Sequence, residues 1–182
     1  MNGVTIYGAS SPHIPDHYLK AAHRVGELLA INGVTLICGG GHTGVMGAAI
    51  DGTLLHQGQA IGVLPQFMVE RGWQHPALTH MEVTPDMHTR KALMARLATR
   101  GIIAMPGGVG TLEELMEIIT WHKLGLYTGN IVILNINGYY DPLLTMLTRT
   151  IQQGFMKPDN RIVWHTAPTA DDAVRHVLAR HD

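Results

Sequence analysis

The stretch AMPGGVGTLEELMEI, residues 104–118, joins a glycine-rich turn to a pair of glutamates. An apolar run ends at a proline, three glycines follow within four residues, and Glu113 and Glu114 fall on the first turn of an amphipathic pattern. Backbone N–H groups and the positive end of a helix dipole at such a turn bind phosphate. Because carboxylates would repel a phosphate, we expect the glutamates to act on another part of the ligand.

Glu114 has two interpretations. If a sugar 5′-phosphate occupies the glycine turn, Glu114 lies near the sugar ring, where a carboxylate can stabilise oxocarbenium character at C1′. It could then activate a water molecule or attack directly. The structural alternative is a capping box, in which Thr111 as the N-cap and Glu114 satisfy each other's backbone donors. The local sequence is compatible with both.

Arg90 and Lys91 lie about one turn into a helix for which Thr84 is a suitable N-cap and Pro85 a suitable first residue. One of the two could reach the site, balance the phosphate charge and orient Glu114. The planar guanidinium suits this role because it can hold phosphate or carboxylate with two hydrogen bonds. The alternative for both residues is a solvated helix face.

The histidines do not predict a metal site. Although the sequence contains 12 histidines, no cluster has zinc-ligand spacing, and His13 and His17 are separated by a proline and lack an accompanying glutamate. We therefore expect no bound metal. Met87, Met94 and Met105 fit core packing, with a flexible apolar pocket for a purine as the alternative.

The composition limits the partners. The 13 basic and 14 acidic residues nearly cancel, so neither nucleic acid nor a membrane surface is expected as a partner. The single cysteine, Cys38, excludes an intramolecular disulfide framework and fits a reducing cytosol. The first residues show no signal-peptide pattern, and no apolar run is long enough to span a bilayer. We therefore expect a soluble cytoplasmic protein.

Strand and helix patterns alternate along the chain. Strands are expected at residues 4–7, 34–38, 60–64, 81–83, 101–105, 131–135 and 161–164. Helices are expected at residues 15–31, 45–56, from 85, from about 111, 139–152 and 170–180, with a loop at 66–80. Because the strand patterns are continuous apolar runs, they predict a parallel sheet with helices on both faces. This is a doubly wound α/β fold, in one domain spanning residues 1–182.

Three glycine- or serine-rich turns follow strands in this scheme, at residues 8–11, 39–44 and 107–111. In a parallel sheet the carboxyl ends of the strands lie at one edge, where ligands bind. We therefore expect these turns to converge on a phosphate or nucleotide. None matches a Walker A loop or a GxGxxG motif, so ATP-hydrolysing and dinucleotide-binding functions are not favoured.

Two of these motifs resemble a known family. MHTRKALM at residues 87–94 and PGGVGTLEE at 106–114 resemble the paired MHxRKxxM and PGGxGTxxE signatures of the LONELY GUY (LOG) family. Its members are cytokinin riboside 5′-monophosphate phosphoribohydrolases, often labelled lysine-decarboxylase-like. The similarity continues in CGGGHTGVMGA (38–48), TWHKLGLY (120–127) and LNINGYYDPLL (134–144). It covers nearly the whole chain, in order.

The resemblance implies a Rossmann-like fold and a homodimer, with Arg90 and Glu114 as the catalytic pair. The helices bearing Arg90 and Trp121 would lie near the partner subunit. The residues that would bind the phosphate and the nucleotide are Ser10, Gly41, Gly44, Met46, Met87, Lys91, Gly107, Gly108, Val109, Gly110 and Thr111. Two positions depart from the family pattern: Ala9 stands where a serine is usual, and Arg100 where an aspartate is common.

The expected reaction is hydrolysis of the N-glycosidic bond of adenosine 5′-monophosphates, with or without an N6 modification, to free base and ribose 5-phosphate. No metal or organic cofactor is needed. The alternative is a non-catalytic carrier of a nucleotide or cofactor, of the molybdenum-cofactor carrier type, which would not need the Arg90–Glu114 pair. Pyridoxal phosphate chemistry requires a Schiff-base lysine, and Lys91 is better explained by phosphate contact.

Overall fold

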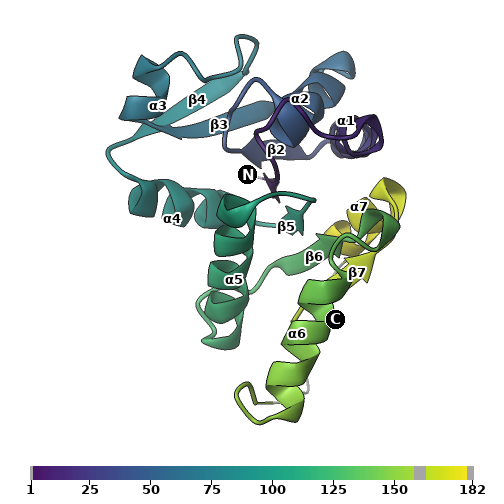
Figure 1. The fold of residues 1–182 in the computed structure, drawn as a ribbon. Coiled ribbons are helices and arrows are strands. Elements are labelled where there is room, and N and C mark those ends of the chain that lie inside the picture. Colours follow the sequence, from purple (N-terminus) through teal and green to yellow (C-terminus); the bar gives the residue numbers. More distant parts are fainter. Residues whose placement is uncertain (1, 158–162, 180–182) are drawn as a thin grey trace.

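The computed structural model describes residues 2–157 and 163–179, whose strands form one parallel sheet (Figure 1). The strands are β1 Gly3–Tyr7, β2 Thr35–Cys38, β3 Ala60–Pro65, β4 His80–Thr84, β5 Gly101–Ala104, β6 Asn130–Leu134 and β7 His165–Ala167. The helices are α1 Asp16–Ile31, α2 Gly44–Leu55, α3 Gln66–Glu70, α4 Met87–Leu97, α5 Val109–Lys123, α6 Asp141–Gln152 and α7 Ala170–Leu178, with a 3₁₀ turn η1 at Ile136–Gly138.

The strand order is β4-β3-β2-β1-β5-β6-β7, and every pairing is parallel. The chain therefore begins at the centre of the sheet, builds one half outward, and returns to the other side of β1 with β5. The point between β1 and β5 is the topological switch point, where ligands of doubly wound proteins bind. The expected Rossmann-like α/β architecture is confirmed.

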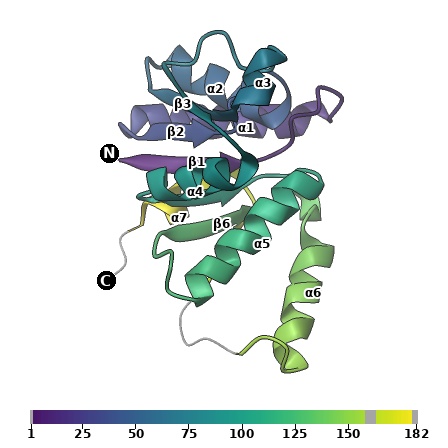
Figure 2. The same ribbon diagram turned by 90° about the vertical axis from the view of Figure 1, so that its left-hand side faces the viewer.

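Helices cover both faces of the sheet (Figure 2). α1, α2 and α7 pack on one face, and α4, α5 and α6 on the other. Successive strand residues point to opposite faces of the sheet. Ile103 of β5 packs in the core under α1, α2 and α7, and its neighbours Ile102 and Ala104 pack in the core under α4, α5 and α6. This two-sided burial is the reason that the strands read as continuous apolar runs.

The segment at residues 66–80 is not a plain loop, as was expected, because it contains α3. A five-residue helix is too short to show a helical period in the sequence. The last strand also differs: it was expected at residues 161–164, but β7 lies at His165–Ala167, where it pairs with β6. Residues 161 and 162 fall outside the described part of the chain.

The helix that carries Arg90 begins later than expected. Thr84 is the last residue of β4, and Asp86 is the N-cap of α4. The Thr89 N–H donates to the Asp86 side chain at 2.7 Å, and this bond lowers the pKa of the Asp86 carboxyl. Aspartate is one of the strongest N-caps, so it outcompetes the Thr84-Pro85 start.

Candidate active site

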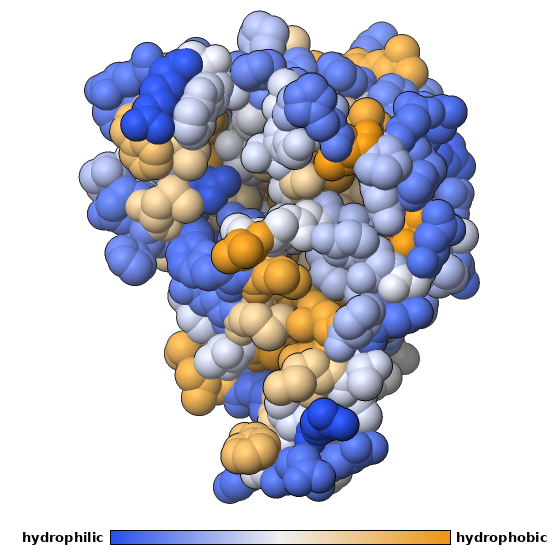
Figure 3. All heavy atoms as spheres, viewed as in Figure 1, coloured by the Kyte–Doolittle hydropathy of each residue, from blue (hydrophilic) through white to orange (hydrophobic). Residues whose placement is uncertain are grey.

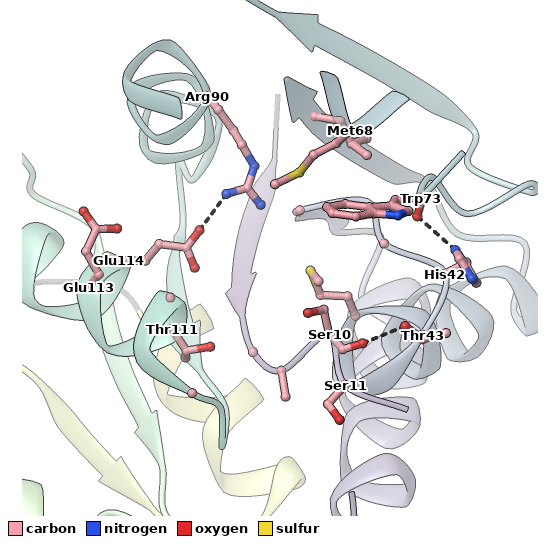
Figure 4. A pocket seen from close by; sticks show the side chains of 18 of the residues that line it. Ser10, Ser11, His42, Thr43, Met68, Trp73, Arg90, Thr111, Glu113 and Glu114 are labelled. Atoms are coloured by element: carbon pink, nitrogen blue, oxygen red, sulfur yellow. Dashed lines mark hydrogen bonds and ion pairs between the residues drawn. The ribbon is translucent and has the colours of Figure 1, made fainter. Parts of the chain in front are cut away.

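A cavity of about 600 Å³ opens at the carboxyl ends of β1, β2 and β5 (Figure 4). Its wall is made by the three turns that follow these strands, by α4, and by the segment around α3. The lining residues are Gly8, Ala9, Ser10, Ser11, Gly39, Gly41, His42, Thr43, Met46, Leu64, Met68, Trp73, Met87, Arg90, Gly108, Gly110, Thr111, Glu113 and Glu114. The convergence expected from the sequence is present.

Most of the residues expected at the site line this cavity. Those that do are Ser10, Gly41, Met46, Met87, Arg90, Gly108, Gly110, Thr111 and Glu114. Those absent from the lining are Gly44, Lys91, Gly107 and Val109. Met87 thus belongs to the cavity wall, whereas Met94 and Met105 are core residues, as expected. Of the two departures from the family pattern, Ala9 lines the cavity. Arg100 precedes β5, at the opposite end of the strand, and donates to Leu178 O.

Arg90 is buried and has a fixed orientation. Its Nε donates to Val63 O at 2.9 Å, and its Nη1 donates to Glu114 Oε1 at 3.0 Å. The two side chains of this ion pair are 8% and 12% exposed. The solvated helix face considered for Arg90 is therefore wrong. Among the lining residues, Arg90 is the one lysine or arginine.

Glu114 is not part of a capping box. α5 begins at Val109 with Gly108 as its N-cap, no side chain caps it, and Thr111 is buried inside the first turn. Burial raises the pKa of the Glu114 carboxyl, and the charge and hydrogen bond of Arg90 oppose this shift. Figure 4 shows the second carboxylate oxygen of Glu114 pointing into the cavity. A carboxyl group with a raised pKa, held by a cation, is suited to proton transfer.

Two helix N-termini face the cavity, and both lack a capping side chain. Gly108 and Gly110 belong to the start of α5, and Thr43 is the N-cap of α2. The Thr43 hydroxyl donates to Ser10 O at 2.6 Å and does not cap α2. In α2 the Val45 N–H already donates to Ala9 O at 2.8 Å. The N-terminus of α5 is therefore the better place for an anion, because its first N–H groups have no partner within the helix and lie at the positive end of the helix dipole.

Two glycines shape the cavity for steric reasons. A Cβ atom at Gly39 would collide with Arg90 Nη2, so only glycine lets the guanidinium reach Glu114. Gly44 has a φ of +67°, and a Cβ there would lie 2.5 Å from Ala9 O. It supports the turn from behind, which explains why it is expected at the site yet does not line it.

Trp73 lies across the cavity from Glu114, and Met68 reaches into the cavity beside Arg90 (Figure 4). Trp73 O accepts hydrogen bonds from the His42 backbone N–H (3.2 Å) and from His42 Nδ1 (3.0 Å), so Nδ1 carries the proton. The Arg71 guanidinium lies 5.2 Å from the Trp73 ring centroid. This part of the cavity wall was not predicted from the sequence, because Met68 and Trp73 lie in the segment at residues 66–80 that was expected to be a loop.

Lys91 turns away from the cavity. Its Nζ donates to Glu113 Oε1 and, at 3.2 Å, to Glu117 Oε1. Like Arg90 it is buried, so the solvated helix face is wrong for Lys91 as well. Cys38 lies at the end of β2, and burial raises the pKa of its thiol to about 11. That thiol stays protonated near neutral pH and is a poor nucleophile.

The described ranges 2–157 and 163–179 contain no group of three or more His, Cys, Asp or Glu side chains that could hold a metal ion. Within the same ranges, no helix has the length and apolar character that a membrane crossing requires.

Comparison with known proteins places these features in a family. Residues 46–177 match a family model described as "Possible lysine decarboxylase". Cytokinin riboside 5′-monophosphate phosphoribohydrolase LOG7 of Arabidopsis thaliana is 39% identical over 171 residues, which cover 93% of this chain and 77% of that protein. LOG4 of the same plant, named for the same activity, is 36% identical over 174 residues, or 94% of this chain and 80% of that protein.

Solved structures support the fold. The molybdenum cofactor binding protein of Rippkaea orientalis has a TM-score of 0.70 at 23% identity, with 95% of this chain and 91% of that chain covered. At this identity the likeness concerns the fold alone. The family match and the identity to the Arabidopsis enzymes, both over most of the sequence, show that the chain belongs to the LOG family.

Proposed function

We propose that this protein is a hydrolase that splits the N-glycosidic bond of adenosine 5′-monophosphates, with or without an N6 modification, and releases the free base and ribose 5-phosphate. The observation that carries the proposal is the buried Arg90–Glu114 ion pair, set beside the uncapped N-terminus of α5 in one cavity. The names of the relatives, cytokinin riboside 5′-monophosphate phosphoribohydrolases, support the same reaction.

The cavity offers a separate place for each part of such a substrate. The 5′-phosphate is bound by the N-terminus of α5, at Gly108, Gly110 and Thr111, where dipole and N–H groups favour an anion. Ribose then lies beside Glu114, one helical turn further on. The base extends toward Trp73 and the methionines, whose apolar surfaces suit a purine and an apolar N6 substituent.

Glu114 acts at C1′ of the ribose. As the bond from C1′ to the base nitrogen breaks, the electron pair leaves with the base, and the carboxylate stabilises the oxocarbenium character left on the sugar. A water molecule forms the new C1′–O bond and gives its proton to Glu114. The departing base takes up a proton from solvent, and Glu114 then releases its proton to solvent, so that one water is consumed. Arg90 holds one oxygen of Glu114 and leaves the other free for this water.

A pyridoxal phosphate enzyme does not fit this cavity, because the lining includes no lysine for a Schiff base. Lys91 is paired with two glutamates, Lys20 pairs with Asp16 on the surface, and Lys123 donates to Lys157 O. A carrier of the molybdenum-cofactor type is the second candidate, favoured by the similar fold. It would bind a ligand and leave it intact.

The homodimer and the cytoplasmic location belong to the same proposal. Apolar side chains gather over the region of α5 and α6 (Figure 3), and Leu124 and Leu126, at the end of α5, are largely exposed. Such a surface is a candidate interface for a second copy. The free, buried Cys38 fits a reducing compartment. Light scattering coupled to size-exclusion chromatography tests the dimer directly.

The reaction is tested by incubating the protein with AMP and with isopentenyladenosine 5′-monophosphate and separating the products by chromatography. We expect free base from the wild type and a loss of about 10²–10⁴-fold in Glu114→Gln, the usual range for an acid–base group. Glu70→Gln is the matched control, since Glu70 is exposed and outside the cavity. Binding of either nucleotide without release of base would favour the carrier.

A further inference from the structure

Two neighbouring residues of α4 pair with neighbouring residues of α5. Arg90 binds Glu114, and Lys91 binds Glu113 and, one turn further along α5, Glu117. The cavity is lined by Arg90, Glu113 and Glu114, whereas Lys91 lies behind them. Three carboxylates of one helix thus face two cations of another.

Lys91 is a buried, permanently charged group. Its side chain is 10% exposed, whereas that of Glu113 is 52% exposed. Burial by itself would lower the pKa of the Lys91 ammonium, but the hydrogen bonds to Glu113 and Glu117 outweigh it and raise the pKa. Burying an ammonium is costly unless it is paired and hydrogen-bonded, so the contacts with Glu113 and Glu117 stabilise Lys91 in this position.

We propose that Lys91 is a positioning residue for the reaction, which binds Glu113 and Glu117 and thereby offsets their negative charge beside Glu114. This role rests on the proposed function, in which Glu114 must be ionised to accept a proton. It replaces the phosphate contact expected from the sequence. The phosphate is then held by the N-terminus of α5, without a lysine.

The charges around Glu114 oppose one another. The groups that face it are Arg90 and Lys91 from α4, Glu113 and Glu117 from its own helix, Tyr7 from β1 and Cys38 from β2. Burial raises the pKa of Glu114, Arg90 lowers it, Glu113 raises it, and Lys91 lowers it. Tyr7 and Cys38 add no charge near neutral pH, because burial raises the pKa of both.

The sign of the effect follows from these contributions. Without Lys91, the pKa of Glu114 rises, so the ionised fraction at a given acidic pH falls. Without the charge of Glu113, the pKa of Glu114 falls. Removing both returns it toward the wild-type value. A residue that only supports the fold would not produce this reversal.

The experiment compares kcat and KM against pH for Lys91→Met, Glu113→Gln and the double variant, with AMP or isopentenyladenosine 5′-monophosphate. We expect Lys91→Met to move the acidic limb of the pH profile of kcat/KM to higher pH by about one unit. At pH values below the limb, kcat/KM then falls about tenfold. The double variant should recover most of this loss, and Glu113→Gln alone should move the limb downward. Lys20→Met, at an exposed ion pair, is the matched control and should leave the limb in place.

Two results would overturn the role of Lys91. A rise in KM for the 5′-monophosphate, with no movement of the limb and no recovery in the double variant, would make Lys91 a phosphate ligand. An unchanged pH profile in Lys91→Met and in Glu113→Gln would show that neither residue affects the ionisation of Glu114.

A second readout does not need turnover. The ¹³C carboxyl shift of Glu114, assigned by its loss in Glu114→Gln, is followed through a pH titration of each variant. The upward shift in Lys91→Met and its reversal in the double variant should appear there too, and their absence would refute the charge balance. If the wild type releases no base, the proposed reaction fails, and this titration still decides whether Lys91 offsets the charge of Glu113 beside Glu114.

Discussion

Replacement of Arg90 by methionine should destabilise the protein in a pH-dependent way. Methionine keeps a long unbranched side chain at this position but carries no charge. Glu114, which is 12% exposed, therefore loses its cation. Breaking a buried ion pair by removing one partner costs about 3–5 kcal/mol. The Val63 carbonyl also loses its donor, which adds roughly 1 kcal/mol. We therefore expect a loss of about 4–6 kcal/mol when Glu114 is ionised.

The sign of the pH dependence follows from the raised pKa of Glu114 in the folded protein. In the absence of Arg90 that pKa rises further, because burial and the charge of Glu113, which raise it, are then opposed by Lys91 alone. Between the ordinary glutamate value, about 4.3, and the raised folded value, the folded state binds more protons than the unfolded state. The free energy of unfolding thus falls as pH rises through this window. Below it, protonated Glu114 needs no cation, and the loss is smaller.

The assay is urea unfolding followed by circular dichroism at about pH 5 and about pH 8, at fixed protein concentration. Arg24→Met is the matched control, because Arg24 pairs with Asp171 and Glu27 on the surface. Exposed pairs contribute about 0–1 kcal/mol. The double variant Arg90→Met/Glu114→Gln should regain stability at the higher pH. A loss in Arg90→Met that matches the control, or that is equal at both pH values, would refute the buried-pair reasoning.

Two further predictions concern the walls of the cavity. Trp73→Ala should lower kcat/KM for isopentenyladenosine 5′-monophosphate about tenfold more than for AMP, since it removes apolar contact with the N6 group; Phe67→Ala, outside the cavity, is the control. Equal losses for both substrates would contradict the placement of the base. Gly39→Ala, whose Cβ would collide with Arg90 Nη2, should displace Arg90 and reduce turnover strongly. A crystal structure of Gly39→Ala with Arg90 unmoved would refute this.

Apolar patterning of the sequence predicts the central strands of the sheet, whereas β7 lies later in the chain than was expected. Strands such as Ile102–Ala104 are buried on both faces, so their residues read as unbroken apolar runs. Glycine turns after β1, β2 and β5 must then lie at one edge, because parallel strands end at the same side. The existence and the place of the cavity are consequences of local sequence and topology.

Short and side-chain-specific features escaped this reasoning. α3 is shorter than the window in which a helical period can be detected, so Met68 and Trp73 could not be placed on the cavity wall. Asp86 and Thr84 both resemble N-caps, and the choice between them depends on where β4 ends. Lys91 follows Arg90 directly, yet consecutive helical residues point about 100° apart, so the two contact different carboxylates.

The chemistry of Glu114 depends on tertiary structure. The local sequence allowed a capping box with Thr111, and only the packing of α4 against α5 brings Arg90, 24 residues away, within 3.0 Å of the carboxylate. By itself the sequence determined the longer helices, the central strands, their order and the residue types at the strand ends, because these depend on local periodicity and backbone sterics. The ion pairs, the burial that raises the pKa of Glu114 and the apolar part of the cavity wall were decided by the tertiary structure. Desolvation and charge pairing depend on distances across elements that no local pattern contains.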